Sequence, residues 1–216
     1  MNNVAVEKLL RYFKQYPLTK YKKGSIIYRP DEPIEHIAFV KKGYVRLYVV
    51  NSDGDERTLN LFKPIFFLTL LFAITNTSNH YYMEAVTDVY LWKAPKKRTI
   101  EFIRQDSVLL FELVTRIMDG LKKVLSNLEH MTTGDSHKKI CGLLVSFATE
   151  YGVTADNGIT IELQTTHNLI ASLTGLTRET VTTRIDKLVK SGLISRQNKT
   201  ITVHDIDRLR KEAGLT

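Results

Sequence analysis

The sequence predicts an α+β fold in which an N-terminal antiparallel β-roll, a long dimerisation helix and a C-terminal winged helix-turn-helix follow one another. Three observations predict this order. Short β-rich segments fill residues 18–92, apolar side chains then repeat at spacings of four and three, and two short helices followed by a β-hairpin lie near the end. We therefore expect a β-roll domain at 1–106, a dimerisation helix and hinge at 107–135, and a winged helix-turn-helix domain at 136–216.

Length and charge set the first limits on function. The 216 residues are enough for one large or two modest domains, each with its own core. The net charge of +8 and the isoelectric point of about 9.4 favour a polyanionic partner without identifying one. Residues 178–199 contain six Lys or Arg residues and two Asp or Glu residues. This local excess of positive charge is more informative than the total.

Cysteine count and hydropathy restrict the compartment and the cofactor. Cys141 is the one cysteine, which excludes an intramolecular disulfide and a four-cysteine zinc or iron–sulfur site within one chain. The N-terminus lacks the apolar core of a signal peptide, and the longest apolar run, residues 65–74, is too short to cross a bilayer. We therefore expect a cytoplasmic protein.

The first part of the chain reads as a helix followed by an antiparallel roll or barrel. Residues 4–16 have helical spacing, and Pro17 ends the pattern. The β-rich pieces that follow lie at 25–29, 37–40, 44–50, 57–62 and 81–92. Gly24, Gly43 and Gly54 stand at strand junctions, where a sharp corner is easiest without a Cβ. The Asp-Gly pair that ends at Gly54 is a hairpin signal. Strands at this density, with no helices between them, favour a roll or barrel.

A short helix is predicted at 98–105 and a long one from Ser107 to about Thr132. Apolar residues alternate along the long helix at spacings of four and three, at Leu110, Val114, Ile117, Leu121, Val124, Leu128 and Met131. This is the a/d seam of a two-stranded coiled coil, so we predict a homodimer; the alternative is a long buried helix in a monomer. Phe111, Leu113, Met118 and Leu125 beside the seam are apolar too, which indicates that the helix also packs on its own β domain, with charges such as Arg116 on the remaining face.

The C-terminal part begins at a predicted hinge. Residues 133–136 break the long helix, and Asp135 or Ser136 is placed to cap the next one. The segments expected after it are a helix at 137–152, a turn-rich loop at 152–158, a short strand at 159–163, a β-hairpin or wing at 195–203 with Gln197 and Asn198 at its tip, and a closing helix at 204–214.

Residues 165–194 carry the most specific pattern in the chain. Thr166 and Thr177 are placed to cap two short helices, and Gly175 between them fits a left-handed turn. Apolar residues at Val181 and Ile185 recur at helical spacing and leave a polar outer face. This is the helix-turn-helix arrangement that places its second helix in the DNA major groove. The alternative is an ordinary helical hairpin inside a core.

The outward side chains of this motif offer groups for both bases and phosphates. Arg178 can donate to guanine, and Glu179 can accept from cytosine N4, although a carboxylate in the first helical turn is also explained by the helix dipole alone. Nearby hydroxyl groups and basic side chains are suited to bind phosphate groups of the DNA. The predicted DNA contacts are Thr165, Thr166, Arg178, Glu179, Thr182, Thr183, Lys187, Arg196 and Lys199.

At this point the sequence resembles the cyclic-AMP receptor protein/fumarate–nitrate regulator (Crp/Fnr) family of bacterial transcription factors. The resemblance covers essentially the whole chain, and the run Arg178-Glu179-Thr180-Val181 matches the family's recognition helix. Thr183 stands where the family usually has a second arginine, and Arg184 comes one residue later. One residue turns a side chain by about 100° around a helix, so we do not expect Arg184 to reach the same base.

The resemblance implies a cyclic-nucleotide-binding-like sensor, but two residue pairs of the cyclic-nucleotide-binding members differ here, the second of which grips the cyclic phosphate in those members. Leu68-Thr69 replace the family's Gly-Glu pair, and Asn79-His80 replace its Arg-Ser pair. We therefore do not expect cyclic AMP to bind, and the single cysteine excludes the iron–sulfur branch. The residues that could line an effector pocket are Phe66, Phe67, Leu68, Thr69, His80, Tyr81, Tyr82 and Leu125. The alternative is that they fill the β-roll core and that no effector is needed.

The function predicted from the sequence is a homodimeric, sequence-specific transcription regulator that binds a pseudo-palindromic site on double-stranded DNA. The alternative is a cyclic-nucleotide- or other small-ligand sensor that acts mainly through protein partners. By the resemblance, an activator would also contact RNA polymerase. We expect no enzyme, no cofactor and no metal site, since we find no clustered carboxylates, Cys/His pair, nucleophile motif or phosphate loop in the sequence.

Overall fold

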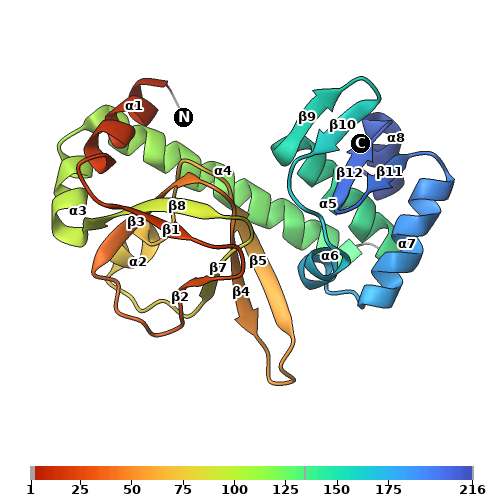
Figure 1. Cartoon of the computed structure of the whole chain (residues 1–216), viewed down its shortest axis with the longest axis horizontal. Helices are drawn as coiled ribbons and strands as arrows, with labels where there is room; N and C mark the ends of the chain where they lie inside the picture. The colour runs from red at the N-terminus through yellow and green to blue at the C-terminus, as the bar shows by residue number, and fades with distance from the viewer. Residues whose placement is uncertain (1–2, 134, 216) are drawn as a thin grey trace. The chain divides into compact units, whose positions relative to one another are not determined.

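The computed structural model describes residues 3–133 and 135–215, without the side chains of residues 3, 123 and 126–133. The chain divides into two compact units, Met1–Lys122 and Lys123–Thr216, which are described separately (Figure 1). Among the described residues, no helix combines the length and the apolar character that a membrane crossing requires.

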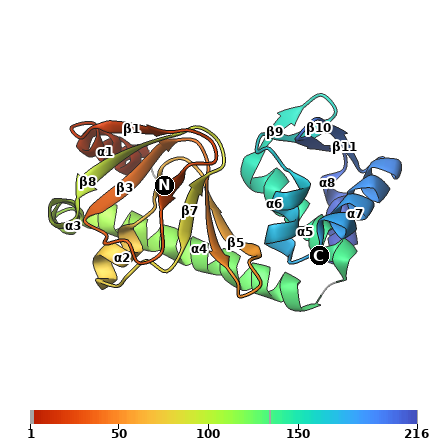
Figure 2. The same ribbon diagram turned by 60° about the horizontal axis from the view of Figure 1, so that its bottom comes forward.

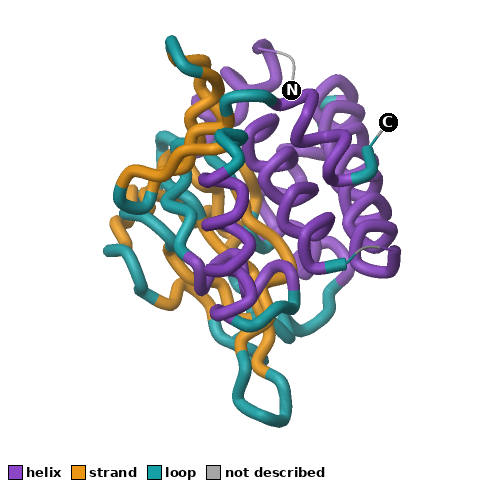
Figure 3. The backbone as a smooth tube through the Cα atoms, turned by 90° about the vertical axis from the view of Figure 1, so that its right-hand side faces the viewer, coloured by secondary structure: helices purple, strands orange, loops and turns teal. Residues whose placement is uncertain are grey.

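The first unit is built on two four-stranded antiparallel sheets, as predicted. One has the order β1-β8-β3-β6 and the other the order β2-β7-β4-β5. Figure 1 labels most of these strands, and Figure 3 shows strands in orange and helices in purple. The strands of the first sheet are β1 Leu18–Tyr21, β8 Val89–Pro95, β3 His36–Lys42 and β6 Phe66–Phe67, and those of the second are β2 Ile26–Tyr28, β7 Tyr82–Ala85, β4 Val45–Val50 and β5 Glu56–Phe62. The helices are α1 Asn3–Phe13, α2 Leu70–Thr75, α3 Lys96–Arg104 and α4 Ser107–Thr133.

Some elements of this unit depart from the sequence prediction. The β-rich piece at 81–92 forms two strands, β7 and β8, in different sheets. The short strands β1 and β6 and the helix α2 have no separate signal in the sequence, because each is too short to show a period. The glycine corners are confirmed: Gly24, Gly43 and Gly54 all have positive φ. At Gly43 a Cβ would also collide with the carbonyl oxygen of Asp88, so the turn there needs glycine.

Aromatic side chains form the centre of the core beside the first sheet. The Phe13 ring of α1 stacks on Phe39 of β3 at 4.7 Å between centroids, and Phe67 lies 4.9 Å from Phe39. Trp92 belongs to the same buried cluster, which also contains Leu109 of α4. The N-terminal helix and the beginning of α4 therefore close one side of the β-roll.

One face of α4 is committed to this core. Leu109 is fully buried and Leu113 is nearly so, which confirms for Leu113 the prediction that the helix packs on its own β domain. For Phe111, Met118 and Leu125 the prediction is wrong, because these residues are 48–73% exposed. Arg116 was predicted on the charged outer face, and this is wrong. Its guanidinium donates to the carbonyl oxygen of Ile65 at 2.6 Å and lies over the Phe66 ring. Burial consequently lowers the pKa of Arg116.

A neighbouring face of α4 is an apolar stripe that is exposed over its described side chains. Five of the predicted seam residues are 44–57% exposed, namely Leu110, Val114, Ile117, Leu121 and Val124. Phe111, Met118 and Leu125 beside them are exposed as well. The remaining seam positions, Leu128 and Met131, lie outside the side chains that the structure describes.

The second unit contains four helices, α5 Ser136–Tyr151, α6 His167–Thr174, α7 Arg178–Lys190 and α8 Ile206–Ala213, besides the end of α4 (Figure 2). Its antiparallel sheet has the order β11-β12-β10-β9, with β9 Gly152–Ala155, β10 Gly158–Ile161, β11 Ile194–Gln197 and β12 Thr200–Val203. The segment predicted as a loop at 152–158 is instead mostly strand β9, which pairs with β10. Gly158, at a φ of 131°, allows the tight turn between them.

We expect Leu109→Ala to destabilise the first unit by about 2–5 kcal/mol, because it removes a fully buried side chain from the core. Urea unfolding followed by the fluorescence of Trp92 reports directly on this cluster, since Trp92 is the one tryptophan in the sequence. Leu59→Ala is the matched control, because Leu59 on β5 is 48% exposed and its loss should change stability by less than about 0.5 kcal/mol. Equal effects of the two substitutions would contradict this account of the core.

Candidate nucleic-acid interface

Local hydrogen bonds define the two helices of the helix-turn-helix. The Thr166 hydroxyl accepts from the backbone N–H of Leu169 at 3.1 Å and caps α6. Gly175, with a φ of 70°, ends α6, and the Thr177 hydroxyl caps α7 by accepting from the N–H of Thr180 at 3.2 Å. The three residues therefore have the roles that the sequence predicts.

Burial fixes which side of α7 faces outward. Ile170 of α6 and Val181, Ile185 and Leu188 of α7 are all buried. Arg178, Glu179, Thr183 and Lys187 are exposed, and Thr182 is partly exposed. The predicted polar face is therefore available to a ligand along the length of α7.

The two threonines on this face already use their hydroxyl protons within the helix. Thr182 donates to the carbonyl oxygen of Arg178 at 2.9 Å, and Thr183 donates to that of Glu179 at 3.0 Å. In this arrangement the Thr183 hydroxyl keeps its acceptor lone pairs, whereas the Thr182 hydroxyl oxygen also lies 2.8 Å from a ring nitrogen of His167. A thymine methyl or a base N–H suits them better than a phosphate oxygen.

Thr165 does not belong to the exposed surface. It is fully buried, and both its backbone N–H and its hydroxyl donate to the carbonyl oxygen of Lys199, at 2.9 and 3.3 Å. We therefore remove Thr165 from the predicted DNA contacts. Its role is to fasten the tip of the wing to the start of the helix-turn-helix.

The wing itself is the β11–β12 hairpin. Arg196 and Lys199 on it are exposed, as expected for phosphate contacts. Gln197 pairs with Thr200, so the turn consists of Asn198 and Lys199, one residue later than predicted. Asn198 adopts a φ of 57°, which asparagine tolerates better than most residues.

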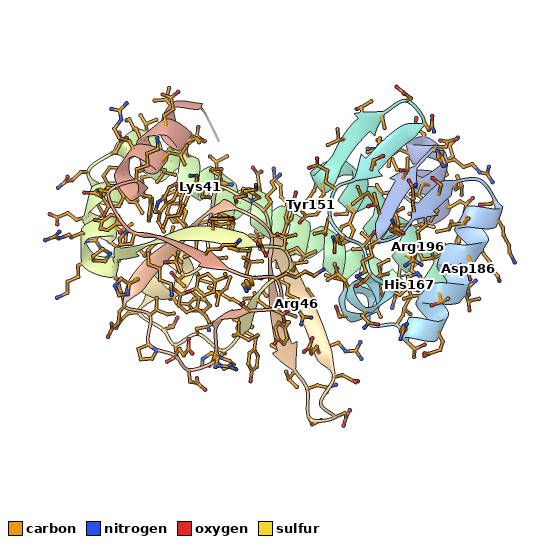
Figure 4. All side chains as sticks on the ribbon, viewed as in Figure 1. Lys41, Arg46, Tyr151, His167, Asp186 and Arg196 are labelled. Carbon is orange, nitrogen blue, oxygen red and sulfur yellow. The ribbon has the colours of Figure 1, made fainter. Side chains whose placement is uncertain are left out.

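His167 connects all three elements and was not predicted from the sequence. Its Nε2 lies 2.7 Å from the guanidinium of Arg196, and its Nδ1 lies 2.8 Å from the Thr182 hydroxyl (Figure 4). Arginine can only donate, so Nε2 accepts and the proton of the neutral ring is assigned to Nδ1, which donates to Thr182. The wing, α6 and α7 are thus joined by one continuous chain of hydrogen bonds.

Electrostatics favour the neutral form of His167. Burial lowers the pKa of the ring, and the positive charges of Arg196 and Arg178 lower it further, while Asp186 acts in the opposite direction. No sequence pattern distinguishes this histidine, because its partners come from a different helix and from the wing.

Arg184 points away from the exposed face, as the one-residue offset predicts. Its Nε donates to the Ser136 hydroxyl at 2.9 Å, at the start of α5. Asp135 caps α5 by accepting from the N–H groups of His137 and Lys138 at 2.8 and 3.0 Å. These backbone bonds, with a contribution from Arg184, lower the pKa of Asp135 despite some desolvation. The arginine therefore supports the start of α5, and Thr183 keeps the outward position.

Comparison with known proteins agrees with this geometry. Residues 138–212 match the model of the Crp-like helix-turn-helix domain, and residues 18–106 match that of the cyclic nucleotide-binding domain. A global nitrogen regulator of Synechococcus elongatus is 31% identical over 86% of this chain and 85% of its own length. A CRP/FNR-family transcriptional regulator from Thermus thermophilus, of known crystal structure, is 26% identical, with a TM-score of 0.74 and coverage of 92% of this chain and 98% of that one.

The chain belongs to the Crp/Fnr family. It is a transcriptional regulator with a helix-turn-helix DNA-binding domain, joined to a β-roll of the cyclic nucleotide-binding fold. The relatives named above are both regulators.

Two of the four positions that differ from the family's nucleotide-binding pairs, Thr69 and Asn79, have structural roles in this chain. Thr69 is fully buried; its hydroxyl accepts from the N–H of Ala38 at 3.0 Å and donates to the carbonyl oxygen of His36 at 2.9 Å. Asn79 is also fully buried, and its amide is bonded to backbone atoms of Arg29 and Tyr81. Neither side chain supplies a cation for a cyclic phosphate.

The predicted effector residues are not gathered in one pocket. Phe67 and Leu68 are core residues, whereas the His80 side chain is 71% exposed and lies 3.3 Å from Asp31. Leu125 is also exposed. The remaining aromatic residues pack against neighbouring rings: Phe66 on Phe62, Tyr82 on Tyr48 and Tyr81 near Phe72. The effector pocket, and the alternative in which these residues fill the β-roll core, both stay predictions.

Arg46 of β4 is a partly buried cation in the β-roll, but its charge is already balanced. Its guanidinium donates to the carboxylates of Glu84 and Glu56 at 2.6 Å each and lies over the Tyr48 ring (Figure 4). Desolvation opposes the charged form, yet the two carboxylates outweigh it and raise the pKa of Arg46. An incoming phosphate would have to displace both acids.

We expect acidification to destabilise the DNA-binding domain through His167. The folded-state pKa of this residue lies below its unfolded value of about 6.5, so below that pH the unfolded chain takes up the proton first and folding loses stability. His167→Gln keeps an acceptor and a donor but cannot titrate. The midpoint temperature of thermal unfolding should therefore fall more steeply between about pH 8 and pH 5 for the wild type than for this variant.

His167→Ala provides the second comparison, because it removes both hydrogen bonds and should lower the unfolding midpoint at every pH. Parallel pH profiles for the wild type and His167→Gln would contradict the assigned network, since the other histidines are common to both proteins.

Proposed function

We propose that the chain regulates transcription as a homodimer that reads a pseudo-palindromic DNA site with two copies of α7. The observation that carries the dimer is the exposed apolar stripe of α4. In a two-fold dimer, the α7 helices enter successive major grooves, so the half-sites lie about one helical turn apart.

The stripe has the properties of an interface in both spacing and exposure. Its residues follow the 4-3 spacing of a coiled-coil seam, and large apolar side chains such as Ile117 and Leu121 are half exposed in the single chain. Soluble proteins rarely expose contiguous apolar patches larger than a few hundred Å² without a partner. Pairing two copies of α4 buries both stripes at once.

Gly120 on α4 fits the same proposal. A glycine inside a helix costs about 1 kcal/mol relative to alanine. Within one chain a Cβ at this position would meet nothing within 4 Å, so no internal contact requires glycine. Close approach of the partner's backbone gives a reason for it.

On DNA, we assign base contacts to the first turn of α7 and phosphate contacts to the surrounding elements. Arg178 and Glu179 are exposed and offer a donor and an acceptor to base edges. Positive charge for the DNA backbone comes from Lys187, Arg196 and Lys199. Thr166 places the N-terminus of α6 toward a phosphate group. Because Thr183 stands where the family usually has an arginine, we propose a half-site that differs from the family's usual one.

For the β-roll, we propose that cyclic AMP is not the signal. The balanced charge of Arg46 and the internal bonds of Thr69 and Asn79 support this. The second candidate is a sensor that acts mainly through protein partners, and RNA polymerase would be a partner of an activator. Catalysis is no part of the proposed function, and we propose a cytoplasmic location.

We expect Ile117→Lys to convert the dimer into a monomer, because it places a charge in the middle of the apolar seam. Sedimentation velocity measures the change, and affinity for a complete site should fall at least tenfold, which corresponds to about 1.4 kcal/mol. Thr115→Lys is the matched control: it adds the same charge to the same helix at an exposed position outside the seam. A dimer that survives Ile117→Lys unchanged would refute the proposed interface.

We expect Arg178→Ala with Glu179→Ala to abolish site-specific retardation while leaving the dimer intact. A good base contact contributes about 1–3 kcal/mol of discrimination, so losing two brings the site close to non-specific affinity. The site is first obtained by selecting bound sequences from random DNA at fixed salt, which also tests its two-fold symmetry. Lys187→Ala should instead weaken binding to all DNA sequences by a similar factor. If the selected DNA sequences had no two-fold symmetry, this would count against a homodimer that binds a pseudo-palindromic site.

We expect saturating cyclic AMP to leave the affinity for the selected DNA unchanged, because a ligand shifts an equilibrium only through differential binding. Fluorescence anisotropy of labelled DNA, with and without the nucleotide, measures this. A nucleotide-dependent gain in affinity would show that Arg46 or another cation is released for phosphate binding.

A further inference from the structure

Three side chains with metal-ligating atoms meet between α5 and α8, away from the predicted DNA contacts. They are His137 and Cys141, one turn apart on α5, and Glu212 near the end of α8. The histidine Nε2 lies 2.8 Å from the Glu212 carboxylate and 3.6 Å from the Cys141 sulfur, and the three ligand atoms all lie within 4.8 Å of one another.

We propose that His137, Cys141 and Glu212 form a binding site for a divalent transition-metal ion of the zinc type. Imidazole and thiolate select such ions over magnesium or calcium, which prefer oxygen ligands alone. Three protein ligands leave the fourth position of a tetrahedral ion to water. His137 and Glu212 are partly exposed, so that position is open to solvent.

The spacing of the ligand atoms fits one small ion. Metal–ligand distances of about 2.3 Å to sulfur and about 2.0–2.2 Å to nitrogen and oxygen, at tetrahedral angles, separate the ligand atoms by about 3.3–3.6 Å. The sulfur–nitrogen distance of 3.6 Å already matches this range. The nitrogen–oxygen distance of 2.8 Å is that of a hydrogen bond, so Glu212 moves outward by a small rotation to admit the ion.

Charge around Cys141 also favours a cation. The Cys141 side chain is fully buried, and its sulfur shares the cluster with the carboxylate of Glu212. A bound cation would attract the thiolate and the carboxylate at once. Binding thus forms a metal–sulfur bond and releases the thiol proton to solvent.

Glu212 also has an outer partner. Its second oxygen, Oε1, lies 3.5 Å from the guanidinium of Arg208, one turn earlier on α8. Outer contacts of this kind orient a ligating carboxylate and leave its other oxygen, Oε2, directed at the ion. Without an ion, the same residues form an ordinary histidine–glutamate pair beside a buried cysteine.

The sequence does not predict this metal site, because its ligands lie far apart along the chain. His137 and Cys141 are spaced to share one face of a helix, but Glu212 is far along the chain and meets them only through the packing of α8 on α5. An ion here would tie the first turns of α5, next to the predicted hinge at 133–136, to the last turn of α8.

The experiment is titration of the metal-free, reduced full-length protein with Co²⁺ under exclusion of oxygen. We expect one equivalent per chain, a near-ultraviolet thiolate-to-cobalt charge-transfer absorption, and visible bands of tetrahedral intensity. Zn²⁺ should displace Co²⁺ and bleach these bands. Both ions should raise the unfolding temperature, because they bind the folded state.

Single substitutions assign the ligands. Cys141→Ser should abolish the charge-transfer band, and His137→Gln and Glu212→Gln should each weaken binding by more than about 100-fold. Arg208→Gln should weaken it by about tenfold, as expected for an outer partner. His80→Gln is the control, since it removes a histidine that pairs with Asp31 in the other unit. Circular dichroism establishes that each variant is folded.

The proposal is overturned if the wild type shows no charge-transfer band, or if folded His137→Gln and Glu212→Gln bind Co²⁺ as tightly as the wild type. The second result would mean that the cysteine binds the ion alone. Because these two variants retain Cys141, the test stands even if Cys141→Ser does not fold.

Discussion

The rest of the molecule depends on the fixed orientation of α4 about its own axis, which decides which of its faces packs on the β-roll. Leu109 and Leu113 complete the core beside the first sheet, and Arg116 donates to the backbone at Ile65. Once these contacts are made, the helix cannot turn without exposing them. The 4-3 stripe that includes Ile117 is therefore held outward, and its exposure follows from the packing of the β-roll.

The DNA-binding surface is organised by a different kind of contact. Its inner side is fixed by apolar burial, but the relation between wing, α6 and α7 rests on hydrogen bonds through His167 and Thr165. Such bonds are directional, so they set the spacing of Arg196 and the α7 face more sharply than burial alone. Pre-ordered side chains lose less entropy on binding, which favours affinity.

The sequence predicts those features that depend on neighbours within one or two helical turns. The caps at Thr166 and Thr177, the turn at Gly175 and the seam of α4 all follow from local chemistry, and the structure contains the two caps and the turn as predicted. The dimer that the seam implies stays a prediction.

Features that depend on distant partners escape the sequence. Thr165 has the hydroxyl of a phosphate contact but is buried against Lys199 of the wing, and Arg116 looks solvated until β6 is in place. His167 and the cluster around His137 are assembled from separate elements. In each case the residue type was visible in the sequence, and its surroundings were not.

The β-roll shows how a binding fold can be kept while its ligand chemistry is replaced. By the family resemblance, Thr69 and Asn79 stand where residues that hold a cyclic nucleotide are usual. Here both side chains are fully buried, and their polar groups form hydrogen bonds with backbone atoms of other segments of the domain. A ligand that competed for these groups would break buried hydrogen bonds, each at a cost of about 1–3 kcal/mol. These internal bonds are the physical reason for the proposal that cyclic AMP is not the signal.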